Sequence, residues 1–257
     1  MTENTGIGLA TLGAQMGYKT KFVLPESLAV EKYQTLEALG AEIIIVKLVP
    51  FADPNHFYHT ARRLAEADPL GFWANQFENL ANFRIHRATT GPEIWQQTEG
   101  QITDFCAAMG TGGTFSGVSH FLKEKNPQIR TTVVDPMGSG LYSLIKSGEI
   151  KSEGTSVTEG IGIMRVTANF KEAKIDEVLR VQDQEMIDML YHLAKYEGLL
   201  VGTSAALNVC AAWKIAKAGK NRKIATILCD GALRYQSKIF NPEWLKEKNL
   251  IPKPLSL

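Results

Sequence analysis

The sequence is poor in cysteine and has no excess of one charge, and each shortage excludes a class of protein. Its three cysteines, Cys106, Cys210 and Cys229, lie far apart and match no metal-binding spacing. The 28 basic and 27 acidic residues nearly cancel, so no field of one sign indicates binding to nucleic acid or to an anionic membrane. We therefore expect neither a metal site nor a nucleic-acid partner.

Long apolar runs are also missing. No run reaches the roughly 18 residues that a membrane-spanning helix needs. The first residues, Met1 to Asn4, lack the basic stretch and apolar core of a signal peptide. We expect a cytoplasmic protein without a membrane partner. With 257 residues, 44% of them apolar, the chain is long enough for one large domain or two modest ones.

Histidines do not supply a metal site either. His56 and His59 share one face of an expected helix, but no third ligand accompanies them. His86 is expected at a surface or helix position. We therefore predict no bound metal.

What the sequence does contain is an alternation of helix and strand patterns. Apolar residues at helical spacing predict helices at residues 5–16, 28–39, 56–67, 115–125, 183–196 and 205–218. Short apolar or β-branched runs predict strands at residues 20–24, 43–46, 71–74, 104–109, 131–134 and 225–229. Ser27 is the expected N-cap of the second helix. This alternation predicts βαβ units and parallel sheets.

We expect two α/β lobes. Residues 1–88 would form a smaller, incomplete lobe, and residues 89–257 a larger one. The first expected helix has no strand before it, which suggests that an N-terminal segment of the fold is missing. Ligands in such folds bind beyond the carboxyl ends of the strands.

The most informative local feature is a glycine-rich loop, Gly110-Thr111-Gly112-Gly113-Thr114, between an apolar strand and a helix. Backbone N–H groups at a helix N-terminus bind anions, and glycines let the backbone approach closely. The loop lacks the lysine of a nucleotide-triphosphate loop and the spacing of a dinucleotide loop. It is either a phosphate site or a packing turn at the end of a strand.

Further motifs give the loop a context. In chain order they are Asn4-Thr5-Gly6, Gln76-Phe77-Glu78-Asn79, Thr89 to Trp95 (TTGPEIW), Glu159-Gly160-Ile161-Gly162 and Cys229-Asp230 with Arg234-Tyr235. Together with the glycine loop, this series resembles the fold-type II pyridoxal-phosphate-dependent enzymes over nearly the whole chain. It is most similar to the cysteine synthase (O-acetylserine sulfhydrylase) family. The resemblance implies a two-lobed fold like that of the tryptophan synthase β subunit, with pyridoxal 5'-phosphate as cofactor.

The resemblance also implies roles for individual residues. The cofactor phosphate would be held by five loop residues: Gly110, Thr111, Gly112, Gly113 and Thr114. Asn4 would bond the cofactor's ring hydroxyl, and Thr5 with Gln76 would hold the carboxylate of an amino-acid substrate. Gly160 and Ile161 would line the substrate side of the ring. Other interpretations stay open, namely a helix cap for Asn4, a solvated loop amide for Gln76 and turn glycines for Gly160 and Gly162.

The sequence departs from the family pattern at several places. The lysine that binds the cofactor covalently should lie upstream of Asn4, and no other lysine has its sequence context. Glu3 stands near the expected carboxylate site, where its charge would repel the substrate. Gly231 follows Cys229-Asp230 where the family has a hydroxyl for the ring nitrogen. We therefore expect the chain alone to be inactive or very weak.

The reaction implied is β-replacement, in which O-acetylserine and sulfide give cysteine and acetate. Asp135-Pro136-Met137-Gly138-Ser139 has some similarity to the cystathionine β-synthase branch, which uses homocysteine as nucleophile. The alternatives are a non-catalytic remnant that binds phosphate, the cofactor, an amino acid or a partner chain, and the product of a decayed gene. Family members are usually dimers, so a homodimer is expected.

Overall fold

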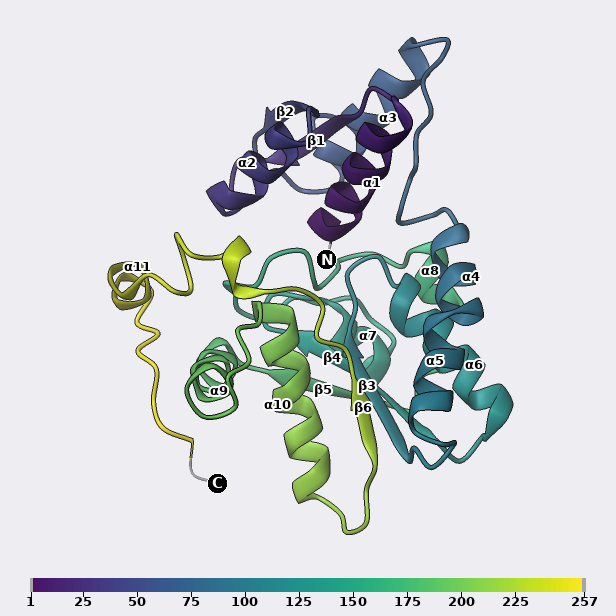
Figure 1. Cartoon of the computed structure of the whole chain (residues 1–257), viewed down its shortest axis with the longest axis vertical. Helices are drawn as coiled ribbons and strands as arrows, with labels where there is room; N and C mark the ends of the chain where they lie inside the picture. Colours follow the sequence, from purple (N-terminus) through teal and green to yellow (C-terminus); the bar gives the residue numbers. More distant parts are fainter. Residues whose placement is uncertain (1, 256–257) are drawn as a thin grey trace.

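The computed structural model describes residues 2–255, without the side chains of Thr2 and Glu3, and forms two α/β lobes (Figure 1). The smaller lobe contains α1 (Thr2–Met16), β1 (Lys21–Pro25), α2 (Val30–Ala38), β2 (Glu42–Val46) and α3 (Phe57–Ala67). Its two strands are parallel, with Lys21 opposite Glu42. Ile7, Ala10, Leu24 and Leu36 form its buried core.

The larger lobe is built on a four-stranded parallel sheet in the order β5-β4-β3-β6. Its strands are β3 (Asp104–Ala108), β4 (Arg130–Pro136), β5 (Glu177–Val181) and β6 (Ile224–Thr226). Its helices are α4 (Ala81–Ala88), α5 (Thr90–Gln97), α6 (Gly113–Lys125), α7 (Leu141–Ser147), α8 (Ala168–Lys171), α9 (Asp183–Tyr196), α10 (Thr203–Lys217) and α11 (Pro242–Glu247), with a 3-10 turn at Ala232–Arg234. The α/β fold class with parallel sheets is confirmed.

Alternating residues of β3 explain how this sheet is covered on both faces. Phe105 and Ala107 pack with the apolar residues of α6, whereas Cys106 and Ala108 pack with those of α9 and α10. All five residues of β3 are buried. A strand buried on both faces is mostly apolar, and the run from Phe105 to Ala108 is why the sequence pattern identified it; Asp104, at its start, is paired with Arg222.

Several details differ from the sequence-based expectations. Residues 71–74 are not a strand, because the segment crosses between the lobes with Phe72 exposed and without a neighbouring strand. Ser27 is not an N-cap; Ala29 holds that position without a side-chain bond. The pattern missed β5, whose burial is mixed because it lies at the sheet edge.

The helix α4 lies within residues 1–88 but packs against α6 of the larger lobe. Gly117 of α6 allows this approach, because a Cβ there would lie 2.6 Å from the carbonyl oxygen of Phe83. The division of the chain at residue 88 stays a prediction. This contact favours a boundary between the lobes that lies before residue 81, where α4 begins. In the part of the chain that the structure describes, no helix is long and apolar enough to span a membrane.

The strand order places a switch point beside β3. The chain proceeds from β3 through β4 to β5 on one side, whereas β6 pairs with the opposite side of β3. Such a switch point is where ligands bind in open α/β sheets. The side chain of Asn208, fully buried on α10, lies between the two strands here. Its Oδ1 accepts from the Ala108 N–H at 2.7 Å, and its Nδ2 donates to the Ile227 carbonyl at 2.8 Å.

Replacing Asn208 by alanine should therefore destabilise the fold. Two buried backbone groups would lose their partners, at about 1–3 kcal/mol each, so we expect a loss of about 2–6 kcal/mol in the free energy of unfolding. Chemical denaturation measures it. Asn55→Ala, at an exposed position, is the control and should change stability little. Equal stabilities of the two variants would contradict the role given to Asn208.

Candidate functional site

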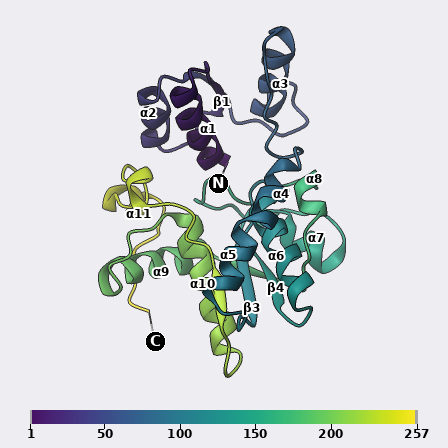
Figure 2. The same cartoon turned by 45° about the vertical axis from the view of Figure 1, so that its right-hand side comes forward.

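The carboxyl ends of β3 and β6 and the start of α1 face one another between the lobes. Figures 1 and 2 show the N-terminus of α1 directed at the larger lobe from above its sheet. The glycine loop follows β3, and Asp230 follows β6. Asp104 lies opposite Ile224 and Cys106 opposite Thr226, so Gly110 and Asp230 are equally far along neighbouring parallel strands. The glycine loop, Asp230 and Asn4 therefore lie at the same end of the sheet, beyond the carboxyl ends of its strands.

The glycine loop has the conformation that the sequence predicts. Gly112 is the N-cap of α6 with φ of 95°, a left-handed conformation that favours glycine. A Cβ on Gly112 would lie 2.9 Å from the Phe170 nitrogen, and one on Gly113 only 2.1 Å from Asn82 Oδ1. The space therefore admits glycine alone. Because the loop leads directly into the N-terminus of α6, its N–H groups are suited to an anion.

Side chains behind the loop hold its two threonines. Thr111 Oγ1 accepts from Asn82 Nδ2 at 2.9 Å, and Thr114 Oγ1 bonds His86 Nε2 at 3.0 Å. His86 Nδ1 bonds Thr90 Oγ1 at 2.9 Å. Burial lowers the pKa of His86, so the ring is neutral at pH 7, with one donor and one acceptor nitrogen. His86 lies in a helix, as expected, but its contact with the loop was not predicted, because spacing along the sequence does not show that α4 lies against this loop.

An asparagine of α8 connects the loop around Gln76 to this unit. Asn169 Nδ2 donates to the carbonyl oxygens of Gln76 at 3.1 Å and Phe77 at 2.7 Å, and its Oδ1 accepts from the Phe83 N–H at 3.1 Å. Asn82 Nδ2 also donates to the Gln76 carbonyl, at 3.0 Å. The backbone of Gln76 is thus held next to the glycine loop, and its side-chain Oε1 is buried rather than solvated. No sequence signal had identified Asn169.

Asn4 lies in the first turn of α1 and reaches the larger lobe. Its Nδ2 donates to Asp230 Oδ2 at 3.0 Å, and its Oδ1 accepts from Arg234. The hydroxyl of Tyr235 donates to the same oxygen of Asp230 at 2.8 Å. The helix-cap interpretation is wrong, since Asn4 lies within α1. Thr5 follows it, half-buried, in the same turn.

The loop that contains Gly160 and Ile161 also contacts the end of β3. The Gly162 N–H donates to the Met109 carbonyl at 2.9 Å, which places this loop against the end of β3. Gly160 and Gly162 have φ of 71° and 77°, so they are turn glycines as well as neighbours of the site. Ile161 is buried.

A buried ion pair fixes this loop to the smaller lobe. Lys32 of α2, 1% exposed, bonds Glu159 Oε2 at 2.5 Å, and its ammonium lies 4.4 Å from the centre of the Tyr235 ring. Lys238 bonds the other oxygen of Glu159. Lys238 therefore belongs to this cluster and is mostly buried. An ammonium held by a carboxylate is a structural cation rather than a free nucleophilic amine.

The residues present fit the group that the resemblance implies. Three glycines, two threonine hydroxyls and a helix N-terminus suit a phosphate. Asp230, which follows the neighbouring strand β6, and Asn4, bonded to it, offer further polar atoms. The carboxylate of Glu3 lies outside the described side chains. Among residues 2–255, no group of three histidine, cysteine or acidic side chains could hold a metal ion.

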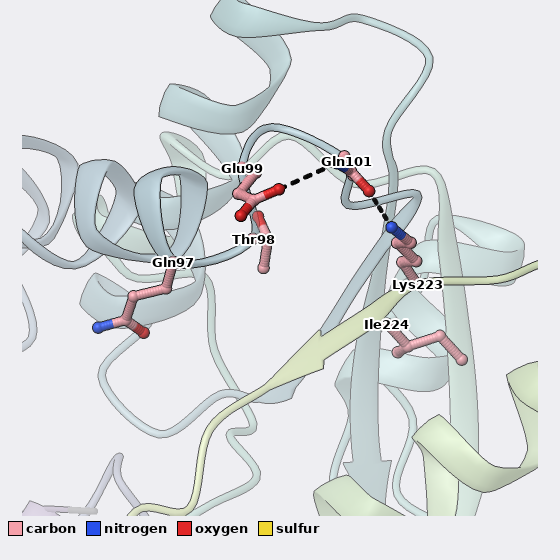
Figure 3. A pocket seen from close by; sticks show the side chains of 6 residues that line it. All are labelled: Gln97, Thr98, Glu99, Gln101, Lys223 and Ile224. Carbon is pink, nitrogen blue, oxygen red and sulfur yellow. Dashed lines mark hydrogen bonds between the residues drawn. The ribbon is translucent and has the colours of Figure 1, made fainter.

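A separate recess lies at the opposite edge of the sheet (Figure 3). It is lined by Gln97, Thr98, Glu99, Gln101, Lys223 and Ile224. Ile224 begins β6, so this recess is at the amino ends of the strands and contains none of the predicted site residues.

Comparisons with known proteins agree with this geometry. The family model described as "Pyridoxal-phosphate dependent enzyme" matches residues 1–230. A cysteine synthase of Dictyostelium discoideum is 42% identical over 264 residues, covering 98% of this chain and 70% of that protein. Cysteine synthase 1 of Neurospora crassa is 44% identical, over 96% of this chain and 68% of its own length. The crystal structure of the O-acetylserine-dependent cystathionine β-synthase from Helicobacter pylori matches with a TM-score of 0.83 at 36% identity, covering 93% of this chain and 75% of that one.

Inorganic phosphate should bind the glycine loop. At millimolar concentration it should shift the amide resonances of Gly112, Gly113 and Thr114. In Gly113→Ala the new methyl group would overlap Asn82, so the affinity should fall by about tenfold or more, equivalent to about 1.4 kcal/mol. Gly8→Ala is the control, because a Cβ at Gly8 meets no atom within 4 Å. Unchanged loop resonances in the unmodified protein would rule out the anion site.

Proposed function

Because this chain belongs to the family of pyridoxal-phosphate-dependent enzymes that includes the cysteine synthases, we propose that its cleft is built for β-replacement on an O-activated serine. O-acetylserine and sulfide would give cysteine and acetate. The observation that carries the proposal is the glycine loop between β3 and α6, against which the Gly160–Ile161 loop is held by the bond between Gly162 and Met109. The cofactor of this family is pyridoxal 5'-phosphate.

The chain's own residues would bind and orient the reactants. The loop from Gly110 to Thr114 would anchor the phosphate, with Thr114 oriented by His86. Asn4 would donate to the ring hydroxyl, since its amide nitrogen carries a second hydrogen besides the one given to Asp230. When bound, pyridoxal phosphate supplies the electron-withdrawing ring on which chemistry at an amino acid's α-carbon depends.

The substrate would occupy the side of the cleft that faces Gln76. The amide of Gln76 and the hydroxyl of Thr5 would donate to its carboxylate, and Gly160 with Ile161 would line the ring. Asn169 would keep the Gln76 loop in place through its bonds to two carbonyl oxygens. These donors suit a small amino acid, which we propose as the substrate class.

We further propose that the 257-residue chain by itself has little or no activity. The reaction needs a lysine that binds the cofactor covalently and moves a proton at the substrate's α-carbon. Among the lysines described here, the buried Lys32 would be the first candidate, but it is paired with Glu159. The chain would then be a phosphate- and cofactor-binding protein that retains the cleft of an enzyme. Assembly into a homodimer and a cytoplasmic location belong to the same proposal.

Homocysteine is the alternative nucleophile. The matched Helicobacter pylori structure is named an O-acetylserine-dependent cystathionine β-synthase, and the segment Asp135 to Ser139 has some similarity to that branch. In this chain the segment has contacts within the fold. Asp135 Oδ2 accepts from the Tyr142 N–H at 2.8 Å, and Ser139 Oγ accepts from the Ile163 N–H at 3.1 Å. These bonds do not distinguish sulfide from homocysteine.

The purified chain should bind pyridoxal phosphate without fixing it to one lysine. Losing a positioned acid–base group alone costs roughly 10²–10⁴-fold in rate. After borohydride reduction and digestion, mass spectrometry should find no single modified lysine, and cysteine formation from O-acetylserine and sulfide should stay near the uncatalysed rate.

Gly113→Ala serves as the matched control, because it should lose reversible binding of the cofactor. One specifically modified lysine together with turnover of about 1 per second or faster, the lower end for typical enzymes, would show that another residue has taken the role. Replacing sulfide by homocysteine in the same assay tests the alternative nucleophile.

A further inference from the structure

One irregular segment, residues 159–167, contacts the smaller lobe and the glycine loop at once. Near its start, Glu159 pairs with Lys32 of the smaller lobe at 2.5 Å. At its end, the buried hydroxyl of Thr167 donates to the carbonyl oxygen of Thr111 in the glycine loop at 3.1 Å. The segment therefore connects the position of the smaller lobe to the backbone of the glycine loop.

Arg165 gives the same segment a second contact with the smaller lobe. The centre of its guanidinium lies 4.6 Å from the centre of the Phe51 ring and 4.9 Å from that of the Tyr58 ring. The ring of Phe77, between the lobes, is 5.0 Å away, and the carboxylate of Glu78 pairs with the same guanidinium. A cation within about 6 Å of an aromatic ring centre is attracted to the ring face, and a planar guanidinium can stack on rings while it donates to a carboxylate.

The two contacts involve different helices of the smaller lobe. Lys32 belongs to α2 and Tyr58 to α3, and Figure 2 shows these helices on either side of α1. One contact would let the smaller lobe turn about it, whereas two separated contacts fix its angle to the larger lobe. The side chains of Arg165 and Glu78 are 22% and 31% exposed, against 1% for Lys32, so Arg165 can be replaced with less damage to the fold.

We infer that Arg165 is a positioning residue. Its contacts with the rings of Phe51 and Tyr58 hold the smaller lobe at one angle to the larger lobe. Through Thr167, the same segment couples this angle to anion binding at the glycine loop. The fixed angle follows from these contacts alone, whereas the coupling rests on the proposed function. Because such coupling is reciprocal, an anion on the loop also favours the fixed angle.

Residual dipolar couplings of the backbone amides test the angle between the lobes without attached probes. In the unmodified protein one alignment tensor should fit both lobes. In Arg165→Met the strands β1 and β2 should need a second tensor of smaller magnitude, because methionine keeps an apolar chain but loses the charge and the planar donors. The affinity for inorganic phosphate, followed at the Gly113 amide, should fall by about fivefold, at the lower end of typical coupling between sites.

Arg180→Met is the matched control. Arg180 also lies over an aromatic ring, 4.2 Å from the centre of Tyr142, and pairs with Glu153, but both partners belong to the larger lobe. One tensor should still fit both lobes, and the phosphate affinity should change little. Phe51→Leu removes one ring at an exposed position and leaves the charge of Arg165 in place, so it should produce the same changes as Arg165→Met to a smaller degree.

The outcomes separate the inference from the proposed function. One tensor for both lobes in Arg165→Met and Phe51→Leu, two tensors already in the unmodified protein, or equal effects in Arg180→Met would overturn the inference and leave the proposed function standing. Two tensors with unchanged phosphate affinity would overturn the coupling. Absence of phosphate binding in the unmodified protein would overturn the anion site of the proposed function, and the coupling with it.

Discussion

The site depends on two neighbouring parallel strands being held apart at their carboxyl ends. Asn208 does this by satisfying one backbone donor of Ala108, just at the end of β3, and one backbone acceptor of Ile227, just beyond β6. Without such a side chain the strands would either pair further or leave buried polar groups unmatched. This point is the switch point of the sheet, where the chain leaves β3 for the glycine loop and β6 for Asp230.

The second constraint is the polar contact between the lobes. Glu159 joins Lys32 of the smaller lobe to Lys238 of the C-terminal segment, and Asn4 joins Asp230. Removing one partner of a buried ion pair is strongly destabilising, because it leaves an unmatched charge. Glu159 directly precedes Gly160, so this ion pair also fixes the loop that would line the cofactor ring. A movement of the smaller lobe relative to the larger one would therefore also move the loop that contains Gly160.

Much of this could be predicted from the sequence, for physical reasons. Strands buried on both faces, such as β3, are recognisable by their apolar runs, and the glycines of Gly110 to Thr114 by the backbone approach they allow. The sequence could not show which side chains lie behind the loop. The loop is contacted by side chains from distant segments, namely Asn82, His86 and Asn169. From residue type alone, each of them would be expected at the surface. The edge strand β5 was not predicted, because its residues are only partly buried and show no clear apolar pattern.

The central claim is that the carboxyl ends of β3 and β6 receive a phosphorylated cofactor at the glycine loop. A crystal structure of the chain with pyridoxamine 5'-phosphate tests it most directly. The account predicts phosphate oxygens within hydrogen-bond distance of the backbone nitrogens of Gly112, Gly113 and Thr114, with the ring toward Asn4 and Asp230. A phosphate bound elsewhere, for instance beside Lys223 in the recess of Figure 3, with the glycine loop empty, would contradict it.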